Sequence, residues 1–121
     1  MKILIVEDEE SLAFVLKEKL EKSKFETRVA KDGELALTLA RAFKPEMILL
    51  DLILPKKDGF AVLKELKADP ELSTVPVIIL SNLGEDENIK KAFALGAKDY
   101  FVKSQHPINE IIEKIESART A

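Results

Sequence analysis

The chain contains five short apolar segments, and each is followed by a longer segment in which apolar residues recur at helical spacing. The runs Met47–Leu50 and Val77–Leu80 consist entirely of large apolar residues, which is typical of strands buried on both faces of a parallel sheet. In contrast, Phe25, Thr27 and Val29 alternate with charged residues, which predicts a half-buried strand at a sheet edge. The remaining predicted strands are Lys2–Val6 and Tyr100–Val102.

Apolar residues three and four positions apart predict a helix after every strand. Turn signals such as Asp32-Gly33 and Asp58-Gly59 separate the elements, and Gly96 closes the fourth helix. The predicted apolar stripes are Leu12, Leu16 and Leu20; Leu35, Ala36, Leu39, Ala40 and Phe43; Phe60, Leu63 and Leu66; Ile89, Ala92 and Phe93; and Ile108, Ile111, Ile112 and Ile115. Strict alternation of strand and helix predicts an α/β fold with parallel strands, right-handed crossovers and helices on both faces.

Composition narrows the class of protein. A length of 121 residues predicts one domain over residues 1–121. The net charge is -3 and no Lys/Arg block is long enough to suggest nucleic-acid or membrane binding. The absence of cysteine excludes disulfides and thiolate chemistry. Glu7 interrupts the first apolar run too early for a signal peptide, and no apolar run approaches a membrane span, so we expect a soluble cytoplasmic protein.

Polar residues follow four of the five predicted strands. Glu7 and Asp8 come after the first strand, Asp51 after the third, Ser81 after the fourth and Lys103 after the fifth. Ligands of open α/β sheets gather at the carboxyl ends of the strands. If the first and third strands are neighbours, Asp8 and Asp51 emerge about 5 Å apart.

Carboxylates this close together require a cation. Oxygen ligands without histidine or cysteine nearby select Mg²⁺ or Ca²⁺, and Mg²⁺ suits a site with few carboxylates. A Mg²⁺ ion and a lysine beside an aspartate are what phosphoryl transfer requires, because they neutralise charge on the phosphoryl oxygens. The Ser81 hydroxyl adds a donor, and Lys103 adds a mobile point charge.

Each of these residues also has a simpler interpretation. The acidic run Glu7–Glu10 could favour a helix dipole, and Asp51 could cap a helix, although Gly59 places the next helix start too far downstream. Ser81 and Lys103 taken singly are ordinary loop residues. We expect His106, the one histidine, to lie on the surface and assign it no function. The specific signal is the placement of the polar residues on successive strand ends.

The chain resembles the receiver domain of two-component response regulators over essentially its whole length. The matching residues are Glu7-Asp8, Asp51 with Pro55 and Gly59, Ser81, and Tyr100-Phe101-Val102-Lys103. The resemblance implies a single doubly wound (βα)5 domain with the strand order 2-1-3-4-5. It also implies that Asp51 accepts a phosphoryl group from the phosphohistidine of a sensor kinase or phosphotransfer protein.

The same resemblance implies further roles. Asp8 and Asp51 would hold Mg²⁺ together with the main-chain carbonyl of Ile53, and Glu7 would act through a water. Ser81 and Lys103 would bind the phosphoryl group.

Tyr100 would be the aromatic switch whose rotamer follows Ser81. A downstream protein would bind the face formed by the fourth helix, last strand and fifth helix. The domain would not be an enzyme, because it promotes only its own phosphorylation and dephosphorylation.

Two positions depart from the family pattern. Asn82 stands where a small residue usually follows the hydroxyl, and we expect it to crowd the approach to Asp51 and to slow both gain and loss of the phosphoryl group. Ser104 stands where proline usually follows the lysine, and the isomer of the Lys103–Ser104 bond stays open at this stage.

Three alternative functions remain to be weighed. An aspartate-nucleophile phosphatase of the haloacid dehalogenase type needs a second Asp where Ile53 stands. A flavodoxin-like protein needs a first loop rich in Ser, Thr and Gly, whereas Glu7–Glu10 would repel a phosphate. A receiver-like module that is never phosphorylated would not need the complete acceptor set.

Overall fold

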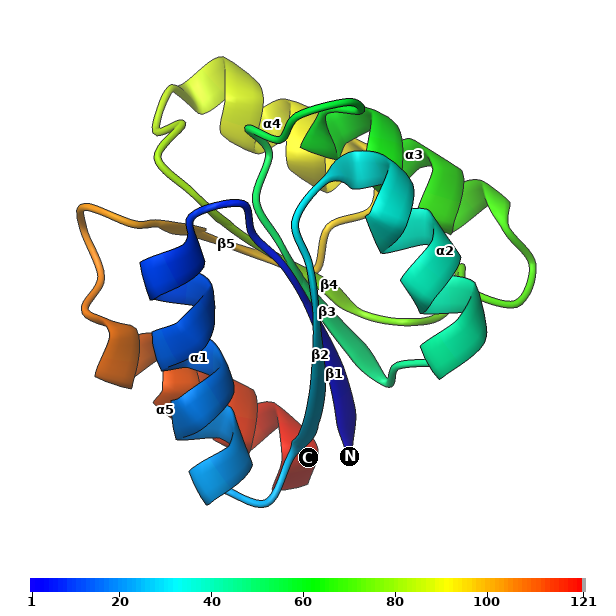
Figure 1. Cartoon of the computed structure of the whole chain (residues 1–121). Helices are drawn as coiled ribbons and strands as arrows, with labels where there is room; N and C mark the ends of the chain where they lie inside the picture. The colour runs from blue at the N-terminus through cyan, green and yellow to red at the C-terminus, as the bar shows by residue number, and fades with distance from the viewer. Residues whose placement is uncertain (121) are drawn as a thin grey trace.

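The computed structural model describes residues 1–120, with side chains through residue 118. The described residues form five strands and five helices that alternate along the chain (Figure 1). They are β1 (Lys2–Val6), α1 (Glu10–Lys22), β2 (Glu26–Ala30), α2 (Gly33–Phe43), β3 (Met47–Leu50), α3 (Gly59–Ala68), β4 (Val77–Ser81), α4 (Asp86–Ala94), β5 (Asp99–Val102) and α5 (Ile108–Thr120). Within residues 1–120, no helix has the length and apolar character needed to cross a membrane.

All five strands are parallel and lie in the order β2-β1-β3-β4-β5, which confirms the implied order. β3 is therefore the middle strand, and its run of four buried residues is enclosed on both faces. β2 is an edge strand, as its alternating pattern predicts. The register pairs Val6 with Leu50 and Ser81 with Val102, so the chain leaves these four strands at the same end of the sheet, their carboxyl end.

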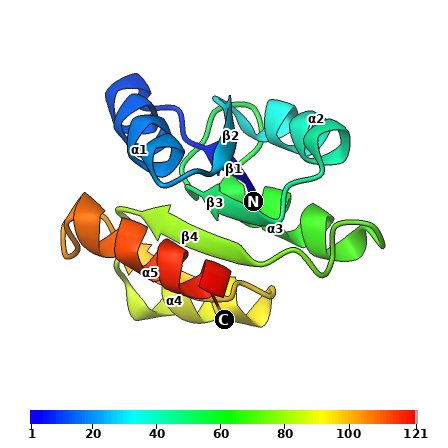
Figure 2. The same ribbon diagram turned by 90° about the horizontal axis from the view of Figure 1, so that it is seen from below.

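The helices form two layers. α1 and α5 cover one face of the sheet, and α2, α3 and α4 cover the other (Figures 1 and 2). Side chains alternate along each strand, so Ile3 and Ile5 belong to the core under α1 and α5, whereas Leu4 and Val6 belong to the opposite core. This division explains why strands with no polar face are stable here.

Side-chain caps and left-handed residues set the helix ends. Asp32 Oδ1 accepts a hydrogen bond from Leu35 N at 2.8 Å, and Asp58 Oδ1 accepts one from Ala61 N at 3.1 Å. Lys44 ends α2 with a φ of 54°, and Gly96 follows α4 with a φ of 106°. Because Asp58 caps α3, Asp51 is not the cap of that helix.

Two residues that the apolar stripes place inside are partly exposed to solvent. Leu35 is 38% exposed and Phe93 is 45% exposed. The buried face of α2 includes Leu37, and that of α4 contains Ala92 alone among its described residues. Successive helical residues are about 100° apart, so a residue beside the centre of a stripe can turn to solvent.

Candidate functional site

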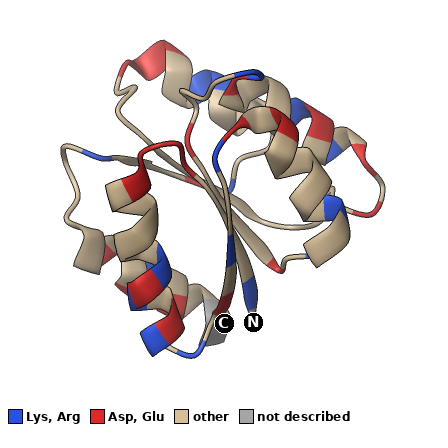
Figure 3. Ribbon diagram, in the orientation of Figure 1, with Lys and Arg blue, Asp and Glu red and all other residues tan. Residues whose placement is uncertain are grey.

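The predicted polar residues meet at the carboxyl end of the sheet. The acidic segment after β1 lies at the end of the molecule where β5 also ends (Figures 1 and 3). Glu7 is 2% exposed, Asp51 5% and Ser81 0%, and of the buried polar side chains in the described chain Thr27 alone lies elsewhere. This end of the sheet therefore contains buried polar chemistry that the hydrophobic core does not require.

Lys103 bridges the two buried carboxylates. Its Nζ lies 2.8 Å from Glu7 Oε1 and 2.9 Å from Asp51 Oδ2, and its side chain is 14% exposed. Burial alone would lower the pKa of Lys103, but hydrogen bonds to Glu7 and Asp51 more than offset this and raise it. Lys103 therefore stays a cation within the site.

Glu7 is held in place through both carboxylate oxygens. Its second oxygen, Oε2, accepts a hydrogen bond from Glu9 N at 3.1 Å. Burial raises the pKa of Glu7, the hydrogen bond from Lys103 opposes this, and the nearby Asp51 charge adds to the rise. The negative charges of Glu7 and Asp51 therefore repel each other within the site.

Asp8 completes an acidic cluster. Glu7, Asp8 and Asp51 each offer one oxygen, and these atoms all lie within 4.8 Å of one another. Three carboxylates and the Lys103 ammonium leave two negative charges, which a divalent cation would balance. The oxygen donors and the charge both fit Mg²⁺.

The backbone just after Asp51 folds back toward the Asp51 side chain. Ile53 N donates to Asp51 Oδ1 at 3.2 Å, and the Ile53 side chain is 54% exposed. This bond holds the Ile53 peptide next to the acidic cluster. The role of the Ile53 carbonyl as a metal ligand stays a prediction.

Ser81 and Tyr100 both contact Leu83, a residue that sequence reasoning missed. Leu83 N donates to Ser81 Oγ at 3.4 Å, and the Tyr100 hydroxyl donates to the Leu83 carbonyl. Burial raises the pKa of Tyr100. Leu83 acts through its backbone, so its side-chain type carries no signal of this role.

Lys103 is also tied to β4 through its backbone, because Lys103 N donates to the Ser81 carbonyl at 2.9 Å.

A family model described as the response regulator receiver domain matches residues 3–116. The chain belongs to this family.

Curated relatives of this receiver domain include transcriptional regulators. The alkaline phosphatase synthesis transcriptional regulatory protein PhoP of Bacillus subtilis (strain 168) is 40% identical over 106 residues, which cover 88% of this chain and 43% of that protein. The chain spans about half the length of the curated relatives it matches.

Solved receiver structures agree along almost the whole chain. The Mn²⁺-bound form of response regulator Rcp1 is 31% identical with a TM-score of 0.85, and the match covers 96% of this chain and 91% of that one. The phosphorylated cyanobacterial phytochrome response regulator RcpA is 32% identical with a TM-score of 0.83, and the match covers 97% of this chain and 89% of that one. The chain is thus a receiver domain of two-component response regulators, a class of signalling domain.

The two departures from the family pattern lie beside the site of this receiver domain. Asn82 is exposed and borders a groove of about 290 Å³ together with Glu9, Lys103 and Ser104. The Lys103–Ser104 bond is trans, as are the other peptide bonds of the described residues.

His106 lines the same groove and is half-buried rather than fully on the surface. Its ring contacts Phe101 edge to face at 5.2 Å between centroids, and its Nδ1 lies 3.1 Å from Glu110 Oε2.

Proposed function

We propose that Asp51 is the phospho-acceptor of this receiver domain and takes its phosphoryl group from a phosphohistidine of a sensor kinase or phosphotransfer protein in the cytoplasm. The observation that carries the proposal is the place of Asp51 at the end of the middle strand. The carboxylates after β1 lie on one side of it, and Ser81 and Lys103 on the other. No other acidic residue of the described chain combines these neighbours.

The transfer exchanges one bond at phosphorus. An Asp51 carboxylate oxygen forms the new P–O bond, the P–N bond of the phosphohistidine breaks, and its electron pair goes to the imidazole nitrogen, which takes up a proton. Lys103, 2.9 Å from Asp51 Oδ2, would then pair with a phosphoryl oxygen, and the Ser81 hydroxyl would donate to another.

Asp8, Asp51 and the Ile53 carbonyl would hold Mg²⁺, and Glu7 would act through a water. The ion, when bound, neutralises charge on the phosphoryl oxygens. Glu7 is suited to an indirect role because both of its oxygens already accept bonds, from Lys103 and from Glu9 N. The same groups would promote loss of the phosphoryl group, so the domain acts on itself and turns over no separate substrate.

Incubation with phosphoramidate, a small P–N donor, tests this proposal. Intact mass should increase by one phosphoryl group in Mg²⁺ and stay unchanged in excess chelator. No gain in Mg²⁺, or an equal gain in chelator, would refute the Mg²⁺-dependent acceptor.

We further propose that the phosphoryl group acts on the face formed by α4, β5 and α5, where a downstream protein would bind. The support is the chain of contacts from Ser81 through Leu83 to Tyr100, because movement of Ser81 toward the phosphoryl group would disturb both bonds to Leu83. Phosphorylation would then shift an existing equilibrium. We expect no direct nucleic-acid contact by these residues.

Amide exchange with and without a phosphoryl mimic tests the output face. Exchange rates should change within residues 82–104 and stay constant in α2. Changes confined to α2 would refute this face.

A further inference from the structure

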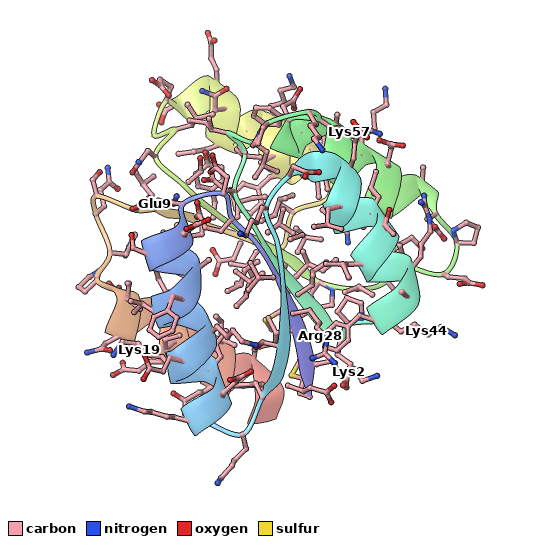
Figure 4. All side chains as sticks on the ribbon, in the orientation of Figure 1. Lys2, Glu9, Lys19, Arg28, Lys44 and Lys57 are labelled. Atoms are coloured by element: carbon pink, nitrogen blue, oxygen red, sulfur yellow. The ribbon has the colours of Figure 1, made fainter. Side chains whose placement is uncertain are left out.

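The loop between β3 and α3 rests on the start of α2. Gly33, the first residue of α2, donates its N–H to the Pro55 carbonyl at 3.3 Å and is buried. Figure 4 places Lys57 of this loop beside the beginning of α2. The loop that follows Asp51 is therefore supported by a helix that carries none of the site residues.

Gly33 leaves no room for a side chain at this contact. A Cβ atom there would lie 1.9 Å from the Lys57 carbonyl oxygen and 2.7 Å from the Lys57 Cβ. Gly33 does not have a positive φ, so glycine is needed for space rather than for backbone freedom. Because the nearest atom is backbone, relief of the overlap requires the loop or the helix to move by more than a side-chain rotation.

The loop is also held at both of its ends. Ile53 N donates to Asp51 Oδ1 at 3.2 Å, and Gly59 N donates to the Leu52 carbonyl at 2.9 Å. Between these points, Lys57 N donates to the Pro55 carbonyl at 2.8 Å around Lys56, whose φ is 67°. This tight turn ties the position of Lys57 to that of Pro55, within the segment that begins at Ile53.

We propose that Gly33 is a positioning residue of the phosphorylation site: its missing side chain lets the loop lie against α2, and this sets the Ile53 peptide beside Asp51. The inference rests on the proposed function, in which the Ile53 carbonyl binds Mg²⁺. Mg²⁺ requires ligand distances of about 2.0–2.1 Å and near-octahedral geometry, so a loop displaced by a fraction of an ångström loses affinity.

Gly33→Ala tests the inference through Mg²⁺ affinity, measured by titration at a temperature where the variant is folded. We expect about 10- to 100-fold weaker binding, the usual effect of losing a group that orients a metal ligand. Gly84→Ala is the matched control, because its Cβ would meet Val102 Cγ1 at 3.4 Å, and it should bind within about twofold of the parent.

Asp32→Asn tests whether the Asp32 charge, rather than the backbone contact between Gly33 and Lys57, affects Mg²⁺ binding. It keeps a good helix cap but removes the pair between Asp32 and Lys56, whose atoms are 3.8 Å apart. Mg²⁺ affinity should again stay within about twofold, because Lys56 is exposed.

A measurement on the unaltered protein decides the matter even if Gly33→Ala does not fold. Because coupling between two sites is reciprocal, Mg²⁺ must stabilise the Gly33–Pro55 bond if that contact favours Mg²⁺. Amide exchange at Gly33 should therefore slow in saturating Mg²⁺, while Lys44 N, bonded to the Ala40 carbonyl at the far end of α2, keeps its rate.

The outcomes separate the two proposals. A parent protein that binds no Mg²⁺ refutes the proposed function and this inference with it. A parent that binds Mg²⁺ while the Gly33 exchange rate is unchanged, or while folded Gly33→Ala binds equally well, refutes the role of Gly33 alone.

Discussion

The two ends of the sheet treat charge in opposite ways. At the amino end, Lys2 and Arg28 lie over the Phe43 ring at 5.3 and 4.9 Å, and the Arg28 side chain is 53% exposed (Figure 4). At the carboxyl end, Glu7 and Asp51 are almost completely buried. The Arg28 charge therefore keeps much of its hydration, whereas the Glu7 and Asp51 charges lose most of theirs. Burial of these carboxylates costs folding free energy, so the hydrophobic core alone does not explain their place at the carboxyl end.

The largest effect should come from removing the cation between the buried carboxylates. Lys103→Met leaves Glu7 and Asp51 without their shared partner, so the free energy of unfolding in metal-free buffer should fall by about 3 kcal/mol. The loss should shrink as the pH falls, because Glu7, whose pKa burial already raises, can then take up a proton.

Lys31→Met is the control for this prediction. Lys31 pairs with Glu10 at 3.2 Å, and both side chains are mostly exposed. Denaturant unfolding should show a change within about 0.5 kcal/mol. Equal losses in the two variants would abolish the contrast between buried and exposed charge.

The next effect concerns the cation site. Asp8→Asn removes a charged ligand from the acidic cluster, so Mg²⁺ should bind about tenfold more weakly. Asp8 is exposed, so stability should change little. Glu10→Gln, an acidic neighbour outside the cluster, should leave the titration unchanged. Unaltered affinity in Asp8→Asn would place the metal elsewhere.

Periodicity and turn signals together predicted the ten elements to within a few residues, because every strand has a nearly continuous apolar run or a clear alternation. The order of the strands is a matter of hydrogen-bond partners, which periodicity does not encode, and it came from the family resemblance. Phe93 was wrongly predicted to be buried, because the narrow buried face of α4 is centred on Ala92 and the next residue, about 100° further round the helix, turns toward solvent.

The site was predictable as far as it depends on strand ends. Asp8 and Asp51 come together because β1 and β3, which they follow, are neighbours in the sheet. The direct pair between Lys103 and Glu7 could not be predicted, since it depends on how two loops fold over the sheet. The close approach of Gly33 to Lys57 is likewise a tertiary contact between residues far apart in sequence.

A smaller effect is expected at the groove beside the acceptor. Asn82 borders this groove with Lys103, so Asn82→Ala should open the approach and remove a donor to the phosphoryl group. Rates of phosphorylation by phosphoramidate and of phosphoryl loss should both rise by about two- to tenfold. Both rates within about twofold of the parent at saturating Mg²⁺ would show that Asn82 has no kinetic role.

The smallest effect should come from the amino end. Arg28→Gln removes a cation from the face of Phe43, so stability should fall by no more than about 1 kcal/mol. The Mg²⁺ titration and the phosphorylation rate should not change. A shift in either would mean that the two ends of the sheet are coupled.

Intact mass after treatment with phosphoramidate and Mg²⁺ shows whether Asp51 carries the phosphoryl group. Asp51→Asn should show no gain in mass. Asp58→Asn is the matched control, because asparagine caps a helix as well as aspartate and Asp58 lies outside the acidic cluster; it should gain one phosphoryl group as the parent does. An undiminished gain in Asp51→Asn would contradict the assignment.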